Sequence, residues 1–306
     1  MHYPGGFNVQ IRLGFPRTQR VRITAGTKPA TALLAALSVA LAPVPAVALP
    51  SLSVRTVSAP TEQPALWVVS DADTTIYLFG TFHALDERTD WFGRDVRAAF
   101  ASSDQLMLET LVPTDPIELT NALSRHKLAA PLVPGAPVIA GGPASTVAKQ
   151  ASQTMAAGRS AGLMVEHGAD AVLRRTALAQ GKPVGGLESF DFQLSMFTGL
   201  PAASPPARSA KSPMVDTPRL LLDMRSAWRR GDGANFARIL ASLEAQSPAT
   251  YQRLFVDRNR DWASWIAERM DRPGTVFVAV GTGHLIGRDS VQRKLASRGY
   301  LATRIN

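Results

Sequence analysis

A short pattern, Gly-Thr-x-His, occurs twice in the chain, at Gly80 to His83 and at Gly281 to His284, and each copy follows an apolar, β-branched run. In an open parallel sheet, ligands bind beyond the carboxyl ends of the strands, where both turns would lie. Glycine at a strand exit allows a sharp turn and a close approach to a ligand. Either histidine alone would more often be structural, but the repeated context predicts that His83 and His284 converge on one site.

Two carboxylates follow strands in the same way, because Glu109 comes after the run Gln105 to Leu108 and Glu188 after Pro183 to Leu187. The chain contains no cysteine, so any metal must be held by imidazole and carboxylate, which suit zinc, manganese or cobalt. A catalytic metal site also needs a carboxylate outside the ligand set to move the proton of the activated water. Taken singly, each glutamate is more often a solvated charge or a neighbour of a helix N-cap.

We assign the proton-transfer role to Glu109. We expect Glu188 to join His83 and His284 as ligands of a divalent metal, or else to orient one of the two histidines. The choice between the glutamates rests on chain order. The strand before Glu109 follows the strand before His83 along the sequence, and consecutive strands are often neighbours in a sheet.

Short β-branched runs alternate with helical patterns, which predicts an α/β fold with a mainly parallel central sheet, flanking helices and a helical insertion between Pro201 and Asp271. The expected strands are Leu66 to Val69, Thr75 to Phe79, Gln105 to Leu108, Pro183 to Leu187, Thr275 to Val280 and Tyr300 to Ile305. The expected helices are Arg94 to Ser102, Ile117 to Leu128, Ser145 to Gly158, Ala169 to Gln180, Pro218 to Arg230, Gly233 to Leu243, Pro248 to Met270 and Asp289 to Arg298.

Residues 1–48 are typical of a secretory signal: a basic stretch, the apolar run Ala30 to Ala42, and Ala46-Val47-Ala48 as an A-x-A cleavage site. The apolar run is shorter than the roughly 20 residues that a bilayer span needs, so we expect cleavage, export to the periplasm or medium, and no membrane span afterwards. Residues 49–64 read as a linker and 65–306 as the α/β domain. The net charge of +9 includes five basic residues of the leader, and no basic run interleaved with aromatics follows, so we expect no nucleic-acid partner.

The paired motifs, the Leu-Glu at Glu109, the run Gly181 to Glu188, the stretch Asp257-Arg258-Asn259 and the closing Ala279 to Gly287 resemble the TraB/GumN family. That family includes the Tiki proteins, which are manganese- or cobalt-dependent proteases, and its fold is similar to that of erythromycin-esterase-like and haem-binding ChaN-like proteins. The resemblance implies that His83, His284 and Glu109 are site residues and that Arg258 is the family's arginine, which we expect to be catalytic. The segment Val112 to Thr154 departs from the family pattern, being shorter and richer in proline and glycine.

Several weaker signals have structural explanations. Gly158 to Gly162 fits the G-x-S-x-G pattern, and His284 could complete a triad with Ser160, but that motif requires a strand directly before the serine, and the preceding residues are helix-like. We expect His126 and His167 to be structural histidines. Three tryptophans at helical positions are expected in the core: Trp228, Trp262 and Trp265.

These observations predict an exported, metal-dependent, peptidase-like hydrolase that acts on a peptide or protein substrate. A non-catalytic protein that binds haem or another ligand through the same histidines is the alternative. A catalytically silent interaction protein is the third class.

Overall fold

The computed structural model describes residues 62–128, 145–198 and 216–306, which belong to one compact unit, 57–306. The predicted signal 1–48, nearly all of the predicted linker 49–64 and most of the proline-rich stretch 201–218 lie outside the described residues. No helix in the described ranges is long and apolar enough to cross a membrane.

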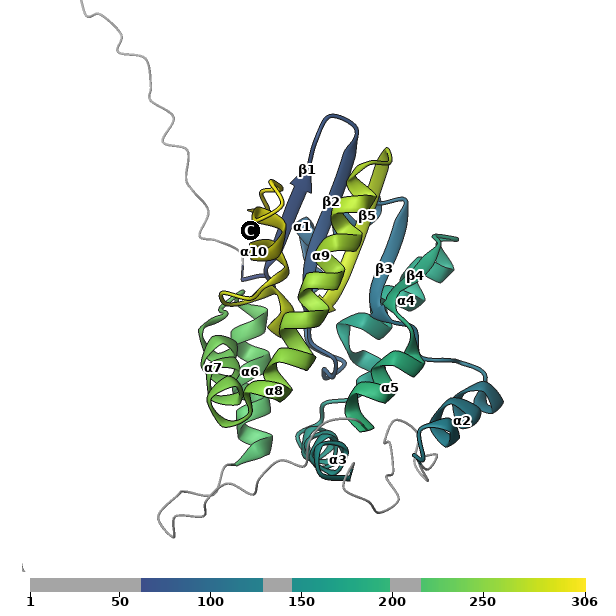
Figure 1. Ribbon diagram of the computed structural model, residues 1–306, viewed down its shortest axis with the longest axis vertical. Coiled ribbons are helices and arrows are strands. Elements are labelled where there is room, and N and C mark those ends of the chain that lie inside the picture. Colours follow the sequence, from purple (N-terminus) through teal and green to yellow (C-terminus); the bar gives the residue numbers. More distant parts are fainter. Residues whose placement is uncertain (1–61, 129–144, 199–215) are drawn as a thin grey trace, which may run out of the picture. The chain divides into compact units, whose positions relative to one another are not determined.

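A six-stranded sheet in the order β4-β3-β5-β2-β1-β6 forms the centre of the unit (Figure 1). The pairs β2–β5, β3–β5 and β3–β4 are parallel, whereas β1 pairs antiparallel with β2 and with β6. The predicted α/β class with a mainly parallel sheet is confirmed. The strands are β1 Leu66–Ser70, β2 Thr74–Thr81, β3 Gln105–Thr110, β4 Val184–Glu188, β5 Gly274–Gly281 and β6 Thr303–Arg304.

Helices connect the strands, and α6 to α9 form the expected helical insertion between β4 and β5. The helices are α1 Arg94–Ser102, α2 Pro116–Arg125, α3 Ser145–Ser160, α4 Ala169–Ala179, α5 Phe190–Thr198, α6 Thr217–Arg229, α7 Ala234–Gln246, α8 Pro248–Tyr251, α9 Asp257–Met270 and α10 Val291–Ala296. Short turns of other helix types are η1 Val165–His167, the π-turn η2 Gln252–Val256 and η3 Thr282–Leu285.

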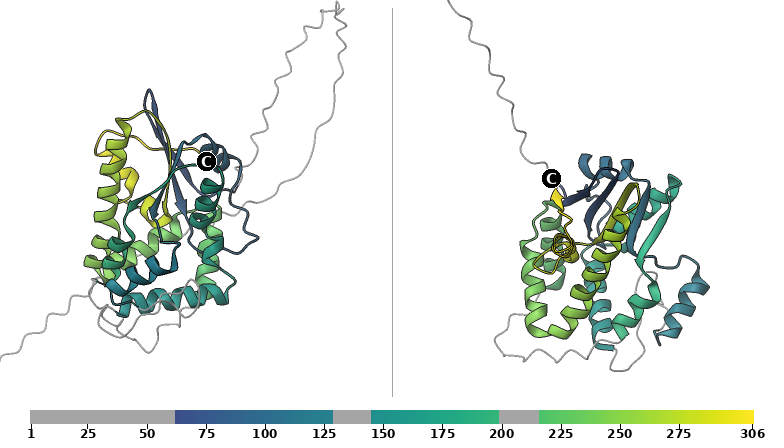
Figure 2. Two further views of the ribbon diagram at one scale, coloured as in Figure 1. Left: turned by 90° about the vertical axis from the view of Figure 1, so that its right-hand side faces the viewer. Right: turned by 45° about the horizontal axis from the view of Figure 1, so that its top comes forward.

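Both faces of the sheet are buried, which explains why its strands read as continuous apolar runs. On β2, Phe79 points into a cluster with α1, α4 and Trp228, while Ile76 and Leu78 point into a cluster with α9 and α10. In the left view of Figure 2, the yellow-green α9 lies on one side of the sheet and the blue α1 and teal α4 lie on the other. The sheet therefore forms the middle layer of three.

Two expectations about the elements were wrong, and a third element contains a feature that the sequence did not predict. Helix α5 was not predicted, because its apolar residues alternate rather than recur at helical spacing; the cap that starts it is Ser189, whose Oγ accepts the Phe192 N–H at 3.1 Å. The predicted helix Pro248 to Met270 is confirmed in its bounds, as the contiguous α8, η2 and α9, and the π-turn η2 is the unpredicted feature. Strand β5 lies between β2 and β3, so the strand that carries Glu109 is not the neighbour of the strand before His83.

Candidate active site

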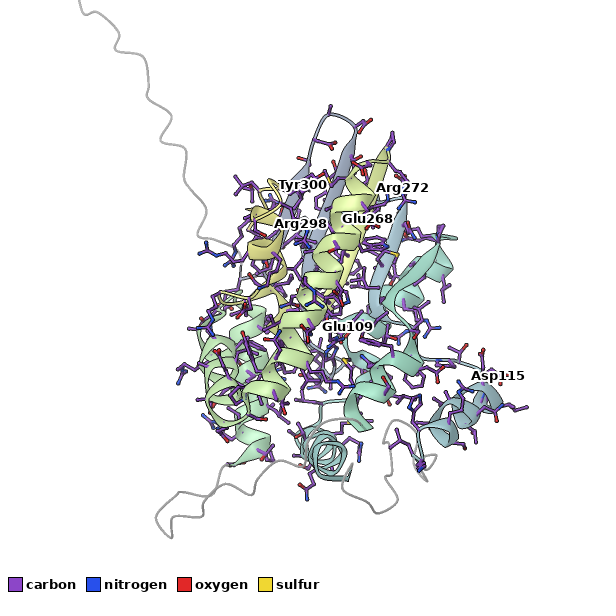
Figure 3. All side chains as sticks on the ribbon, in the orientation of Figure 1. Glu109, Asp115, Glu268, Arg272, Arg298 and Tyr300 are labelled. Atoms are coloured by element: carbon purple, nitrogen blue, oxygen red, sulfur yellow. The ribbon has the colours of Figure 1, made fainter. Side chains whose placement is uncertain are left out.

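The carboxyl ends of β2, β5, β3 and β4 lie at one edge of the sheet because these four strands are parallel. Each end supplies one predicted site residue: His83 follows β2, His284 lies in η3 after β5, Glu109 lies near the end of β3 and Glu188 ends β4. Figure 3 labels Glu109 at this edge, beside α9. The structure brings all four residues together through contacts with Arg258 of α9 and with Gly281.

Arg258 is the centre of the cluster. Its Nη2 donates to Glu109 Oε1, and its Nε and Nη2 donate to the two oxygens of Glu188, at 2.9 Å and 2.5 Å. Its Nη1 lies 3.2 Å from His284 Nε2. The side chains of Arg258, Glu109 and Glu188 are 6%, 12% and 6% exposed. Arg258 therefore pairs with both glutamates at once.

His284 is buried, and its ring is fixed on every side. Its Nδ1 lies 2.6 Å from Asn259 Oδ1, and the Asn259 Nδ2 donates to the Asp289 carbonyl at 2.8 Å. That second bond settles the orientation of the carboxamide, so Nδ1 of His284 carries the proton and Nε2 accepts from Arg258. Burial, together with Arg258, lowers the pKa of His284 to about 3.

Aromatic rings cover His284 from the helix side. The ring centroids of Trp262 and Phe255 lie 4.5 Å and 4.9 Å from the imidazole. The Arg258 guanidinium lies 4.6 Å from the Trp262 centroid, a cation–π contact. Trp262 belongs to the core as predicted, and it also forms a wall of the site.

His83 occupies the open side of the cluster, with a side chain that is 61% exposed. Its Nδ1 lies 2.8 Å from Asp170 Oδ2 on α4. The attraction of the Asp170 carboxylate for the charged ring raises the pKa of His83 to about 9, against the effect of partial burial. The two motif histidines therefore differ in exposure and in the charge of their partners.

The two glutamates also differ. Glu109 Oε1 accepts from Gln193 Nε2 at 3.2 Å as well as from Arg258, and its Oε2 accepts the Gly281 N–H at 3.1 Å. Burial alone would raise the pKa of Glu109, but the charges of Arg258 and the two histidines hold it well below its usual range. Burial dominates at Glu188 and raises its pKa, although Arg258 opposes this.

The glycines of the two motifs make room for side chains at this edge. A Cβ on Gly281 would lie 3.0 Å from His83 Nε2 and 3.3 Å from Glu109 Oε2. A Cβ on Gly80 would lie 3.0 Å from the Thr282 hydroxyl, which donates to the Thr81 carbonyl at 2.8 Å. Each motif's glycine therefore accommodates groups that the neighbouring strands supply.

The π-turn η2 directly precedes the helix that carries Arg258. Such turns are found mostly as single-turn insertions in α-helices, often at functional sites. It carries Phe255, which packs on His284, and the Leu254 carbonyl accepts from Arg258 Nη1 at 3.3 Å. A Cβ on Gly283 would lie only 3.0 Å from the Phe255 ring, so the second glycine of this motif lets the π-turn approach η3.

Sequence reasoning assigned no role to three residues that hold the site together, namely Asp170, Asn259 and Gln193. Asn259 directly follows Arg258 in the stretch Asp257-Arg258-Asn259, which resembles the family, so the sequence could have indicated a role for it. Asp170 and Gln193 lie near the starts of α4 and α5, and nothing in their spacing connects them with the motifs.

The weaker candidates lie elsewhere. Ser160 is in the last turn of α3, is exposed and donates to the Ala157 carbonyl at 2.8 Å, and no strand precedes it. His126 Nε2 lies 3.1 Å from an oxygen of Asp191, as expected of a structural histidine. His167 lies in η1.

Within the described part of the chain, no three histidine or acidic side chains are grouped so that they could hold a metal ion as they stand. Arg258 contacts three of the four predicted site residues at once, namely Glu109, Glu188 and His284.

Comparison with known proteins identifies the family. No curated protein and no solved structure matches the chain. The family model described as the TraB/PrgY/gumN family matches residues 65–138 and 142–304, which include both Gly-Thr-x-His motifs, both glutamates and Arg258. The match covers most of the sequence and agrees with the resemblance found in its motifs. The chain belongs to the TraB/PrgY/gumN family.

Proposed function

We propose that this protein is a metal-dependent hydrolase whose site is the cluster at the carboxyl edge of the sheet. One observation carries the proposal. In both motif histidines Nδ1 is bound to a side-chain oxygen, so Nε2 is the atom presented to the cluster: beside Glu109 and Gly281 for His83, and against Arg258 for His284. Metal-binding histidines are typically oriented in this way by a partner on the other ring nitrogen.

The donor types suit a divalent cation such as manganese, cobalt or zinc, since imidazole nitrogen and carboxylate oxygen bind all three. His83, whose pKa is raised to about 9, would give up its Nε2 proton on binding the metal. When bound, such a metal would lower the pKa of a water molecule and so supply a nucleophile at neutral pH. His284 Nε2 has one lone pair, which already accepts from Arg258 Nη1, so His284 can serve a metal only if Arg258 releases it. The same release would free Arg258 to bind an anionic group of the substrate.

The contacts also suggest how the glutamates divide the work. Arg258 engages both oxygens of Glu188. The oxygens of Glu109 are engaged too, but Arg258 binds Oε1, and Oε2, which accepts the Gly281 N–H, lies on the His83 side of the cluster. We therefore favour Glu109 as the carboxylate that serves the metal or its water, and Glu188 as the anchor of Arg258. The sequence assignment, with Glu188 as a ligand and Glu109 as the proton-transfer group, is the alternative that the glutamine variants below distinguish.

Peptide or protein is the proposed substrate class. Its support is the resemblance to metal-dependent proteases that the paired motifs carry. The exposed His83 provides the accessible side from which such a chain would reach the cluster.

Elemental analysis of the purified protein, followed by a peptide-library assay with manganese, cobalt or zinc, tests the proposal. We expect bound metal and metal-dependent cleavage, both lost in His83→Gln and His284→Gln and both retained in His126→Gln, a control outside the cluster. Glu109→Gln should reduce cleavage by about 10²- to 10⁴-fold if Glu109 moves a proton, with metal retained. Loss of metal in Glu109→Gln, with retention in Glu188→Gln, would make Glu109 a ligand.

Stoichiometric binding of haem or another ligand without any product would favour the alternative, a binding protein. Absence of both metal and ligand would leave the interaction protein as the surviving class.

We also propose export. The basis is the leader at residues 1–48, and intact-mass measurement of secreted protein should give Leu49 as the first residue. A secreted protein that retains the leader would contradict this.

A further inference from the structure

The start of α4 is hydrogen-bonded to, and packed against, the turn that carries His83. The Ala169 N–H donates to the Phe82 carbonyl at 3.0 Å, and Leu85 and Met164 exchange two backbone hydrogen bonds at 3.1 Å and 2.9 Å. Contact is so close at Gly168 that a Cβ there would lie 2.1 Å from the His83 carbonyl oxygen. Backbone packing therefore fixes the position of Asp170, in the first turn of α4, relative to His83.

The carboxylate of Asp170 determines which ring nitrogen of His83 carries the proton. An ionised carboxylate can only accept hydrogen bonds, so Nδ1 of His83 must carry the proton in the 2.8 Å contact with Asp170 Oδ2. This leaves Nε2 on the side of Gly281 and Glu109. A ring that is 61% exposed has few packing contacts to hold it, so the carboxylate supplies the orientation that burial supplies for His284.

We propose that Asp170 is a positioning residue for His83, which turns Nε2 toward Glu109 and strengthens it as a metal ligand. The inference rests on the proposed function. The inference adds an acidic residue to the site, from a helix that carries no other site residue. The two histidines then have different partners: a charged carboxylate for His83 and a neutral amide for His284.

The test uses the mature protein with three substitutions: Asp170→Ala, Asp170→Asn and Asp191→Asn. Asp191 is the matched control, because it also contacts a histidine, His126, away from the cluster. The first readout is the Nδ1–H proton of His83 in nitrogen-15-labelled, metal-free protein, assigned by its loss in His83→Gln. We expect a slowly exchanging signal in the wild type and in Asp191→Asn, a weaker one in Asp170→Asn, whose amide oxygen still accepts, and none in Asp170→Ala.

The second readout is cobalt affinity by titration calorimetry. Loss of a partner behind a metal-binding histidine typically weakens binding by about 10- to 100-fold, so we expect that loss in Asp170→Ala, a smaller one in Asp170→Asn and none in the control. An unchanged Nδ1–H signal in Asp170→Ala overturns the inference, and so does unchanged cobalt affinity when the wild type binds cobalt.

Failure of the proposed function gives a different result. If the wild type binds no cobalt and cleaves no peptide, the hydrolase proposal fails, while the Nδ1–H signal still decides whether Asp170 orients His83. Thermal unfolding of all three variants excludes misfolding as the cause of any loss.

Discussion

The two Gly-Thr-x-His motifs have nearly the same letters and opposite surroundings. His83 is 61% exposed and is paired with the carboxylate of Asp170, whereas His284 is 4% exposed and is paired with the amide of Asn259. The difference arises from the helices that pack beside each motif: Trp262 of α9 and Phe255 of its π-turn cover His284, whereas His83 is reached by Asp170 at the start of α4. The repeated motif therefore places both histidines at the same edge of the sheet, but their exposure and their hydrogen-bond partners differ.

The sheet register shows why the motifs are not equivalent. Thr81 of β2 pairs with Gly281 of β5, so the two copies are staggered by one residue along neighbouring strands. After β5 the chain enters the turn η3, where His284 packs against Trp262 and Phe255. His83, which follows β2, lies on the open side of the cluster. In the proposed hydrolase, His284 is the fixed part of the site and His83 is the part that substrate approaches.

Replacing Arg258 should have the largest effect on stability, because Arg258 lies in the buried part of the cluster with Glu109, Glu188 and His284. Arg258→Met leaves Glu109 and Glu188 buried without their cation, and breaking a buried ion pair in this way typically costs about 3–5 kcal/mol. Urea unfolding at pH 7 measures the loss. Arg260→Met, on the same helix but 54% exposed, should cost less than about 1 kcal/mol. Equal stability of the two variants would show that the cluster does not depend on this arginine.

Asn259→Asp tests whether the buried histidine tolerates the kind of partner that His83 has. The new carboxylate cannot donate to the Asp289 carbonyl, and it lies where the residue is 1% exposed. A buried acceptor left without its donor costs about 1–3 kcal/mol, so we expect destabilisation of that order by urea unfolding. Compensation by a proton on His284 is blocked, because Nε2 already accepts from Arg258. A variant as stable as the wild type would mean that the amide is not required.

The histidines should give stability opposite dependences on pH. The pKa of His83 rises from 6.5 to about 9 in the folded protein, so its contribution is full below pH 6.5 and is lost as the pH rises through 9. The pKa of His284 falls from 6.5 to about 3, so its contribution is present above pH 6.5 and is lost as the pH falls toward 3. Unfolding free energies from pH 4 to pH 10 should lose the alkaline slope in His83→Gln and part of the acidic slope in His284→Gln.

Those pH dependences could not be read from the sequence, and the reason is physical. Strand exits are marked locally, by an apolar run followed by glycine or an acidic residue, so the positions of His83, His284, Glu109 and Glu188 at one edge were predictable. Strand order was not, because β5 comes from the end of the chain and inserts between β2 and β3. The histidine partners depend on how α4 and α9 pack, which no local spacing encodes.

The smallest effect is expected from Ser160, which would matter only if His284 served as the base of a serine mechanism. Its hydroxyl donates to the Ala157 carbonyl in its own helix, and His284 Nε2 is occupied by Arg258. Removing an exposed hydroxyl usually changes stability by less than about 0.5 kcal/mol, so Ser160→Ala should match the wild type in urea unfolding and in peptide turnover. Wild-type protein should also resist labelling by a fluorophosphonate probe. A tenfold loss of turnover, or labelling at Ser160, would require His284 to leave Arg258 and would reverse the roles given to the buried and exposed histidines.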